Sequence, residues 1–361
     1  MDITTKKYKV LFLGETYRAD AITWMNGLKE FGPFDIYTWE LEQAGKGLKK
    51  FKRAFEMLAR LRELKQFVLR IKPDLIIAER VTSYGFIGAL FHRYAPVAVA
   101  QQGITDIYPP DSFTAPVKKR MQHYAFKYAS LIHAWGEIMT YSMLKKGTDP
   151  AKIMVLPKGV DLRQYQFAPQ PTDEKIRAIV TRSLTPDYRH ETILSAFAII
   201  KQQQIPFALT IIGDGYLKEK LIQSASDKNI QDEVIFTGPI PNSDLPKYLS
   251  GSDLYISMPC TEGVSASLFE AMAAGCYPIV TDLPGNKAWI TDGINGRLIP
   301  IDDAAQLAEA IKWYAVNRNQ LQPVLAKNRD TIESKASYQS NMKIISNKYL
   351  NLINNHRSCV V

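Results

Sequence analysis

The sequence contains little cysteine and no long apolar run. Its three cysteines, Cys260, Cys276 and Cys359, are too few and too widely spaced for a disulfide framework or a zinc site. No stretch approaches the roughly 20 uninterrupted apolar residues that are needed to cross a bilayer. The first residues lead into a strand-like segment without the apolar core of a signal peptide. These absences predict a cytoplasmic protein.

Repeats, low-complexity tracts and metal-binding patterns are absent from the sequence as well. None of the five histidines stands in a metal-ligand spacing, and no Asp-x-Asp pair that could hold a divalent ion occurs. With 46% hydrophobic and 22% charged residues, the composition is that of an ordinary globular protein. We expect an ordered chain with neither a metal nor a cofactor.

What the sequence does contain is a regular alternation of short apolar runs with helical patterns. At 361 residues, the chain is longer than a typical domain of roughly 100 to 200 residues. Strands that alternate with helices of this length predict parallel βαβ units covered on both faces. The strand candidates are 8–14, 34–39, 74–79, 96–101 and 130–135, followed by 176–182, 207–213, 233–238, 253–258 and 276–281.

A polar stretch rich in proline and glutamine, 157–175, separates the two sets of strands and indicates an interdomain linker. We therefore predict an α/β protein with two Rossmann-like domains, 1–165 and 166–335, facing each other across a cleft. A C-terminal helix and tail, 336–361, would follow, and packing back on the first domain is one placement we expect for it. Ligands of such sheets bind beyond the carboxyl ends of the strands.

The net charge of +9 lies almost entirely in the N-terminal half. Residues 1–150 hold 23 Lys and Arg against 15 Asp and Glu, whereas residues 151–361 hold 22 against 21. Clustered cations attract an anionic membrane surface, an acidic acceptor or a nucleic acid, and the charge alone does not choose among them.

Residues 46–72 are strongly basic, with 10 Lys and Arg against 2 Glu, and carry Phe51, Phe55, Leu58 and Phe67 near helical spacing. A basic amphipathic helix of this kind can lie on an anionic membrane, here at its inner face. The alternative is a crossover helix whose apolar stripe packs on the sheet, because a βαβ unit requires a helix at this point of the chain.

The segment CTEGVSASLFEAMAAG, 260–275, carries the clearest signs of a binding site. It places Glu262, Gly263 and Glu270 around the start of an alanine-rich helix. The backbone N–H groups of Val264, Ser265, Ala266 and Ser267 would be free at that helix N-terminus, which favours an anion such as a diphosphate. Gly263 would allow the backbone to approach such a ligand closely.

Glu270 is open to two interpretations. As a ligand-binding residue, it would accept hydrogen bonds from a ribose diol, while Glu262 would meet sugar hydroxyls. Alternatively, Ser267 and Glu270 form the S-x-x-E pattern of a capping box, in which the glutamate only ties down its own helix.

The 260–275 segment resembles the E-x7-E signature of family 4 retaining glycosyltransferases of the GT-B fold. Further stretches that resemble the family follow its order along the chain, and the resemblance is close over about 150–315. They are KIMVLPKGVDLRQY (152–165), TRSLTPDYRHETILSAFAII (181–200), LTIIGDGYLKEKL (209–221), VIFTGPIPNSDLPKYL (234–249) and PGNKAWITDGINGRLIP (284–300).

The family pattern implies that Arg182 binds the donor diphosphate. Relatives usually carry a lysine about five residues later, where this sequence has Tyr188 and Arg189. Arg189 is the candidate for the second positive charge, which a metal-free transfer needs in order to stabilise the departing diphosphate.

In the N-terminal half the resemblance holds only in outline. Gly14 is the candidate for close approach to the donor phosphates. Gln102 stands where many relatives have a histidine, and it can exchange hydrogen bonds but not act as an acid or base. Asp106 matches an acidic position found in part of the family, so it is the candidate for contacting the acceptor or the sugar.

The resemblance implies a metal-independent hexosyltransferase that works in surface polysaccharide or glycolipid synthesis. It would move a sugar from a nucleotide-diphosphate donor to a saccharide or lipid-linked acceptor, with retained configuration and no nucleic acid partner. Two alternatives remain: a sugar-nucleotide epimerase or phosphorylase of the same fold, and a non-catalytic protein that binds nucleotide-sugar.

Overall fold

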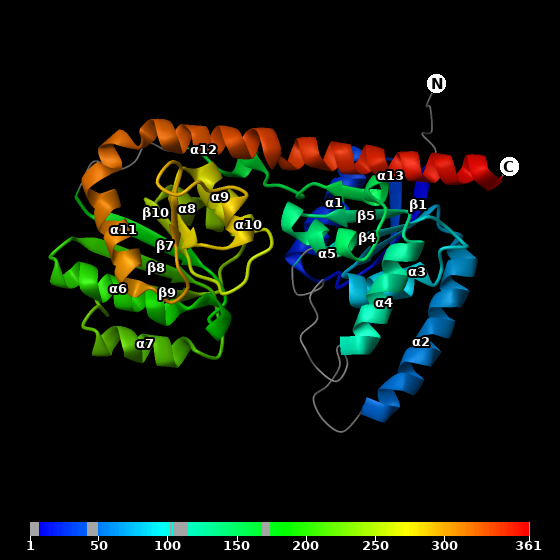
Figure 1. Ribbon diagram of the computed structural model, residues 1–361, viewed down its shortest axis with the longest axis horizontal. Helices are drawn as coiled ribbons and strands as arrows, with labels where there is room; N and C mark the ends of the chain where they lie inside the picture. Colours follow the sequence, from blue (N-terminus) through cyan, green and yellow to red (C-terminus); the bar gives the residue numbers. More distant parts are fainter. Residues whose placement is uncertain (1–6, 42–49, 102, 104–114, 168–173, 361) are drawn as a thin grey trace. The chain divides into compact units, whose positions relative to one another are not determined.

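The computed structural model describes residues 7–41, 50–101, 103, 115–167 and 174–360 (Figure 1). The chain forms two compact units. Unit 1 consists of Met1–Lys158 together with Tyr338–Val361, and unit 2 is Gly159–Ser337. The predicted boundaries at 165 and 335 therefore differ from the observed ones by seven and two residues. The C-terminal segment belongs to unit 1, which contains both parts of the chain that flank unit 2.

Unit 1 is built on a parallel sheet of six strands in the order β2-β1-β3-β4-β5-β6. Strands β1, β3, β4 and β5 are nearly continuous apolar runs, because a parallel sheet covered by helices buries both of its faces. The strands are β1 (Tyr8–Leu13), β2 (Phe34–Trp39), β3 (Leu75–Glu79), β4 (Val97–Gln101), β5 (Leu131–Ala134) and β6 (Ile153–Val155).

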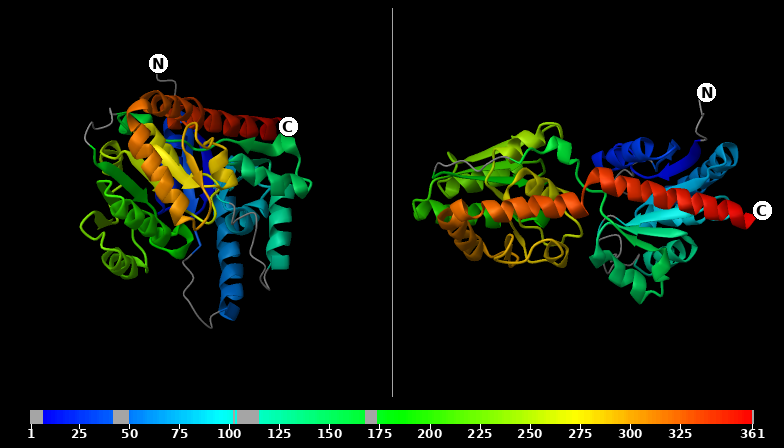
Figure 2. Two further views of the ribbon diagram at one scale, coloured as in Figure 1. Left: turned by 60° about the vertical axis from the view of Figure 1, so that its left-hand side comes forward. Right: turned by 90° about the horizontal axis from the view of Figure 1, so that it is seen from above.

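The helices of unit 1 supply the layers that cover this sheet. They are α1 (Ala19–Phe31), α2 (Lys50–Ile71), α3 (Phe86–Ala89), α4 (Ala115–Tyr128), α5 (Thr140–Lys145) and α13 (Tyr338–Val360). Helix α13 packs against α1, beside which it lies in the right-hand view of Figure 2. Its Met342, Ile345 and Tyr349 are buried with Trp24 of α1 in one apolar cluster. The last helix of the chain is therefore part of the core of unit 1.

The described part of α2 packs on its own unit. Leu64, Val68 and Ile71 are buried at the i, i+4, i+7 spacing of a single helix face. This is the crossover helix that the sequence left as an alternative to membrane contact. Residues 46–49 and the side chains of 50–59, which include Phe51, Phe55 and Leu58, lie outside the description.

Unit 2 repeats the design of unit 1 with a second parallel sheet in the order β12-β11-β10-β7-β8-β9. Its strands are β7 (Ile176–Thr181), β8 (Phe207–Ile212), β9 (Val234–Gly238), β10 (Leu254–Ser257), β11 (Tyr277–Thr281) and β12 (Arg297–Ile299). All ten predicted strands are confirmed within about a residue at each end, and the three-residue strands β6 and β12 were not predicted.

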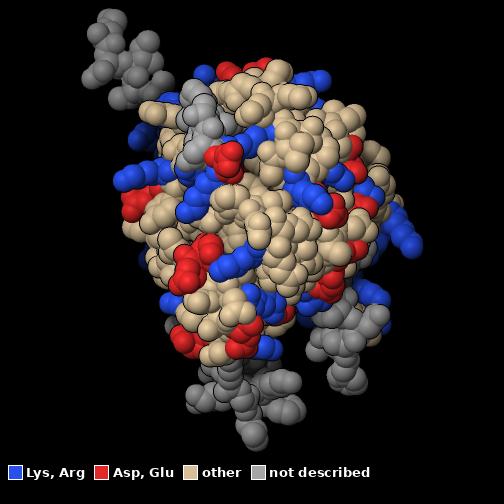
Figure 3. Space-filling view, turned by 90° about the vertical axis from the view of Figure 1, so that its left-hand side faces the viewer, with Lys and Arg blue, Asp and Glu red and all other residues tan. Residues whose placement is uncertain are grey.

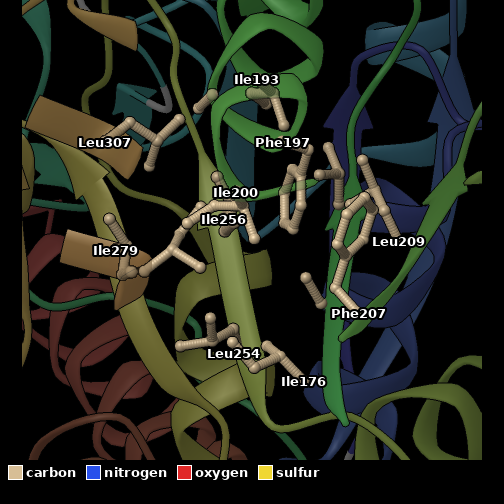
Figure 4. Close-up of a cluster of buried hydrophobic side chains, with 14 of the residues drawn as sticks. Ile176, Ile193, Phe197, Ile200, Phe207, Leu209, Leu254, Ile256, Ile279 and Leu307 are labelled. Carbon is tan, nitrogen blue, oxygen red and sulfur yellow. The ribbon is translucent and has the colours of Figure 1, made fainter. Parts of the chain in front are cut away.

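Helices cover the sheet of unit 2. They are α6 (His190–Gln202), α7 (Lys218–Asp227), α8 (Leu245–Ser250), α9 (Ala266–Ala274), α10 (Pro284–Lys287), α11 (Ala304–Asn317) and α12 (Gln322–Lys335). Phe197 and Ile200 of α6 and Leu307 of α11 pack onto the strands in the apolar cluster of Figure 4. The alanine-rich α9 belongs to a separate buried cluster with Ile179 of β7 and Tyr255 of β10.

Two further properties of the structure concern membrane-spanning helices and surface charge. Within the parts of the chain that the structure describes, no helix is long and apolar enough to span a bilayer. On the face shown in Figure 3, which unit 2 dominates, Lys and Arg side chains are interspersed with Asp and Glu. This mixture agrees with the near-neutral charge of residues 151–361.

Candidate functional site

Each sheet has one point at which the strand order reverses direction. In unit 2 the chain runs outward from β7 through β8 to β9, and then from β10 through β11 to β12 on the other side. In unit 1 the corresponding point lies between β1 and β3. Open α/β sheets bind ligands outside the carboxyl ends of the strands at such points. The two candidate half-sites are therefore the ends of β7 and β10, and the ends of β1 and β3.

Arg182 is the centre of the half-site in unit 2. It follows β7, and its Nε donates a 3.0 Å hydrogen bond to Oγ of Ser257, the last residue of β10. Its Nη2 lies 2.5 Å from Oε2 of Glu262 and also contacts Oγ of Ser265. The Nη1 group donates no hydrogen bond to any residue that the structure describes. The structure thus joins Arg182, Glu262 and Ser265, three of the predicted site residues.

The electrostatics of this cluster keep Arg182 charged. Its side chain is only 13% exposed and that of Glu262 only 12%. Burial acts to lower the pKa of the Arg182 guanidinium, but Tyr255 and Glu262 outweigh it and hold that pKa above its ordinary value. The guanidinium also lies over the Tyr188 ring, 5.3 Å from its centroid, a cation–π arrangement.

Backbone packing holds the loop that carries Glu262 in place. A Cβ on Gly285 would lie 2.4 Å from the carbonyl oxygen of Glu262 and 2.6 Å from that of Gly263. Only glycine allows α10 to approach this loop so closely. From the other side, the N–H of Cys260 donates a 2.8 Å hydrogen bond to the Asp187 carbonyl. The loop is therefore fixed between α10 and the turn that follows Arg182.

Helix α9 begins directly beside the guanidinium. Its N-cap is Ser265, whose Oγ accepts a 3.2 Å hydrogen bond from the N–H of Leu268. The capping-box interpretation of Ser267 and Glu270 is therefore wrong, because Ser267 lies inside the helix and Glu270 is five residues past the cap. The N–H groups of Ala266 and Ser267 have no described acceptor, so they can meet an anion next to Arg182.

Glu270 has a different partner from its own helix terminus. The hydroxyl of Tyr165 hydrogen-bonds to its carboxylate, and burial, followed by the charge of Glu270, raises the pKa of Tyr165 above its ordinary value. Tyr165 is the last residue of the 152–165 motif, so two separate motifs meet at Glu270. Whether Glu270 also holds a ribose stays a prediction.

Arg189 lies apart from the Arg182 cluster in this structure. Its Nε is 3.0 Å from Oδ1 of Asp302, and its Nη1 donates to the carbonyl of Pro186. Its backbone is in the left-handed region, with φ of 49°, directly before α6. The first residue of α6, His190, is buried instead, and burial together with the charge of Arg182 lowers its pKa to about 4. Arg189 as a second cation at the donor stays a prediction.

The Gly213–Gly215 turn supports the Arg182 loop. A Cβ on Gly213 would lie 2.2 Å from the carbonyl oxygen of Arg182, and one on Gly215 would lie 2.3 Å from that of Leu184. Gly213 also has φ of 145°, which side chains rarely tolerate. These glycines therefore serve close packing beneath the site.

The half-site in unit 1 links Gly14 to Glu79 and, through Glu15, to Arg80. A Cβ on Gly14 would lie 2.5 Å from Oε2 of the buried Glu79, which accepts a 3.1 Å hydrogen bond from the N–H of Glu15. Glu15 in turn forms a bidentate pair with Arg80, at 2.9 and 2.6 Å. Gln102 and Asp106, the other candidates in this unit, lie outside the described residues.

Sequence reasoning thus missed Ser257, Tyr165, Glu79 and Arg80. Ser257 and Glu79 are the last residues of β10 and β3, two strands at the reversal points. Had the strand order been known, a polar residue at the end of either strand would have been the signal. Without that order, every strand end is equivalent.

Comparison with known proteins finds a family that unit 2 resembles. Residues 163–331 match the model of the family described as Glycosyl transferases group 1. This range contains Arg182, Glu262, Ser265 and Glu270. The match therefore covers nearly all of unit 2 and the whole of its half-site.

Relatives extend the likeness over more of the chain. The chain is 24% identical over 262 residues to the amylovoran biosynthesis glycosyltransferase AmsK of Erwinia amylovora, covering 70% of this chain and 64% of that protein. It is 27% identical over 224 residues to an Escherichia coli UDP-Gal:alpha-D-GlcNAc-diphosphoundecaprenol alpha-1,3-galactosyltransferase, covering 57% of this chain and 56% of that protein. The chain thus spans somewhat less than two thirds of the length of either relative.

The solved structures give the fold. The crystal structure of Anabaena HepE in complex with UDP and glucose matches with a TM-score of 0.76 at 16% identity, covering 94% of this chain and 99% of that one. This likeness spans both units, each of which has the parallel six-stranded sheet described above. The chain therefore has the GT-B fold, and its residues 163–331 are similar to the group 1 glycosyltransferases.

Proposed function

We propose that this protein transfers a sugar from a nucleotide-diphosphate donor to a saccharide or lipid-linked acceptor, with retention of configuration and without a metal ion. The observation that carries the proposal is the guanidinium of Arg182 at the reversal point of the unit 2 sheet. It is held by Ser257, Glu262 and Ser265, and its Nη1 remains available beside the start of α9.

The donor diphosphate would bind between Nη1 of Arg182 and the N–H groups of Ala266 and Ser267. As the glycosidic bond breaks, negative charge accumulates on the departing diphosphate. A fixed guanidinium and a helix N-terminus stabilise this charge without having to reorganise during the reaction. These groups would supply the positive charge that a divalent ion provides in other sites.

Glu262 has two functions in this proposal. Its 2.5 Å contact with Nη2 holds the guanidinium so that Nη1 points toward the donor. Because a carboxylate has several acceptor positions, the same group can also accept hydrogen bonds from hydroxyls of the donor sugar. Glu270, anchored by Tyr165, would accept hydrogen bonds from the ribose diol.

The acceptor would bind to unit 1, and Gly14 stays the candidate for close approach to the donor phosphates. One relative is named for amylovoran biosynthesis, and another for a diphosphoundecaprenol-linked acceptor. These names support a hexosyl transfer in surface polysaccharide or glycolipid synthesis at the inner face of the membrane. In this setting, 46–72 remains a candidate contact with the bilayer.

A thermal-shift screen of the full chain against UDP, GDP, ADP, CMP and NAD tests the donor site first. A ligand that binds only the folded protein raises its melting temperature, so we expect one nucleoside diphosphate to respond. That response should disappear in Arg182→Ala, whereas Arg297→Ala, which removes an arginine paired with Asp292 elsewhere in unit 2, should keep it. A response to NAD alone would overturn the proposal.

A further inference from the structure

One buried histidine of unit 2 has no described hydrogen-bond partner. His190, the first residue of α6, is only 2% exposed. Neither its Nδ1 nor its Nε2 meets a hydrogen-bonding group within the part of the chain that the structure describes. Nearly all buried polar side chains in folded proteins have such a partner. An imidazole with two unpaired nitrogens is therefore a candidate contact for a bound molecule.

The imidazole of His190 lies near the half-site of unit 2. Burial and, after it, the positive charge of Arg182 lower the pKa of His190 to about 4. The turn before α6 is also tied to the loop before α9, because the Asp187 carbonyl accepts the N–H of Cys260. The start of α6, like that of α9, therefore lies close to the Arg182 guanidinium.

The first turn of α6 offers backbone donors beside the imidazole. The N–H groups of His190 and Glu191 have no acceptor among the described residues, and α6 continues for thirteen residues. The N-terminus of such a helix attracts an anion. The charged neighbours of His190 are engaged elsewhere, since Arg189 pairs with Asp302 and Glu191 with Lys228. The start of α6 therefore combines open backbone donors with an unpaired imidazole.

The ring of Tyr188 lies beside His190 and over Arg182. Its centroid is 6.5 Å from that of the imidazole, with the two rings at 73°, and 5.3 Å from the guanidinium carbon. Arg182 and Tyr188 are thus the titratable groups that the structure places at the imidazole. The Tyr188 hydroxyl makes no hydrogen bond to a described residue, and a cation–π contact at a partly exposed site is weak. The ring is therefore only loosely held in this position.

We propose that His190 binds a phosphate oxygen of the nucleotide-diphosphate donor once the side chain of Tyr188 has moved aside. The diphosphate then contacts Nη1 of Arg182 and the starts of both α6 and α9. The inference rests on the sugar transfer proposed above and adds a donor-binding residue to it.

A bound diphosphate reverses the electrostatics at His190. Without the ligand, burial and the charge of Arg182 keep the imidazole neutral. With the ligand, the phosphate charge outweighs that of Arg182 and favours the imidazolium. His190 therefore takes up a proton from the solvent when the donor binds, and one ring N–H donates to the phosphate oxygen. A histidine that only fills space in the core takes up no proton on binding, so proton uptake separates the two roles.

Isothermal titration of the full chain measures this uptake. The probe is the nucleoside diphosphate that responds in the thermal-shift screen, titrated at about pH 6.5 in MES and in imidazole buffer. These buffers differ in ionisation enthalpy, so the difference in heat gives the number of protons taken up. His190→Gln keeps a hydrogen-bond donor but cannot be protonated. The control, His123→Gln, replaces an exposed histidine of unit 1, and melting curves verify that each variant is folded.

We expect the unaltered protein and His123→Gln to take up about one proton more per bound nucleotide than His190→Gln. They should also bind the nucleotide about tenfold more tightly, because a hydrogen bond to a charged group is lost in His190→Gln. This difference in affinity should shrink as the pH rises to about 8.5, where fewer protons are available for His190. Since the same nucleotide is used throughout, its own titration cancels. Equal proton uptake and equal affinity in His190→Gln would overturn the proposal.

Tyr188→Ala keeps the proposal testable if His190→Gln does not fold. No ring then has to move, so the nucleotide should bind at least as tightly and with the same proton uptake. Weaker binding would overturn the proposed movement of Tyr188. Nucleotide binding that requires Arg182 but takes up no proton would overturn this inference alone. If no nucleoside diphosphate bound at all, both the proposed function and this inference would be overturned.

Discussion

Nε of Arg182 donates a 3.0 Å hydrogen bond to Oγ of Ser257, although 75 residues separate the two in sequence. The bond connects the carboxyl ends of β7 and β10, the two strands between which the sheet of unit 2 reverses its order. The guanidinium is therefore fixed by the sheet itself as well as by the loop of Glu262. A charge fixed in this way needs little rearrangement to meet a ligand.

Arg182→Lys should lower the turnover of sugar transfer at least tenfold while leaving the melting temperature nearly unchanged. Lysine keeps the positive charge, but a single ammonium group cannot contact Ser257, Glu262 and Ser265 and still offer a donor to the phosphate. Steady-state kinetics would show the loss mainly in kcat. Arg297→Lys is the matched control. Full activity in Arg182→Lys would show that the several N–H donors of the Arg182 guanidinium are not needed for sugar transfer.

Ser265→Ala should destabilise unit 2 by about 1 kcal/mol, the usual effect of removing an N-cap side chain. Ser267→Ala should change the free energy of unfolding by a few tenths of a kcal/mol at most, because Ser267 lies inside α9. Urea unfolding of the two variants measures the difference. If Ser267→Ala destabilised the protein more than Ser265→Ala, the result would favour the capping box of Ser267 and Glu270.

Gly285→Ala should displace the loop of Glu262 and reduce both stability and nucleotide binding. The new methyl group would lie 2.4 Å from the carbonyl oxygen of Glu262, so either the loop or α10 has to move. The control is Gly251→Ala, where the nearest backbone atom is 3.5 Å from the added methyl group, an ordinary contact. Isothermal titration with the responding nucleotide, together with melting curves, compares the two variants.

Two buried histidines should make the protein less stable in mild acid. Burial lowers the pKa of His133 to about 4, and burial with Arg182 does the same for His190. The ordinary pKa is near 6.5, so between pH 6.5 and 4 the unfolded chain takes up protons that the folded chain refuses. The free energy of unfolding therefore falls as the pH drops through this window, by at most about 1.4 kcal/mol per pH unit for each histidine.

Urea unfolding at several pH values between 7 and 4.5 measures this loss. His133→Gln should flatten the dependence of unit 1 on pH, although it also loses the contact with the Leu156 carbonyl. His123→Gln replaces an exposed histidine of the same unit and should leave the slope unchanged. If the free energy of unfolding depended on pH equally in the unaltered protein, His133→Gln and His123→Gln, the pH effect could not be assigned to His133.

Most of the fold could be predicted from the sequence, because parallel strands that are buried on both faces consist of consecutive apolar residues. The strands β6 and β12 were not predicted, because each has only three residues and lies at the edge of its sheet, where it has a neighbouring strand on one side only. All of their residues except the buried Ile299 are at least partly exposed, so the hydrophobic pattern of these strands is weak. Pairing with β5 and β11 determines these two strands more than their own composition does.

The candidate site was predictable only where neighbours in sequence are also neighbours in space. The segment 262–270 indicated a helix start, but its N-cap is Ser265, whose Oγ accepts a hydrogen bond from the N–H of Leu268 and also contacts the distant Arg182. Arg189 was placed by its sequence position, whereas the distant Asp302 attracts its side chain. Long-range partners of this kind leave no signal in a single sequence.

The position of α13 sets an order in which the protein can become complete during synthesis. Unit 2 ends at Ser337, so all of its residues leave the ribosome while unit 1 still lacks Met342, Ile345 and Tyr349. Domains generally fold as units when their residues are available. The unit that begins the chain therefore closes its core last, and a nascent chain stopped before 338 would carry a finished unit 2 attached to an open unit 1.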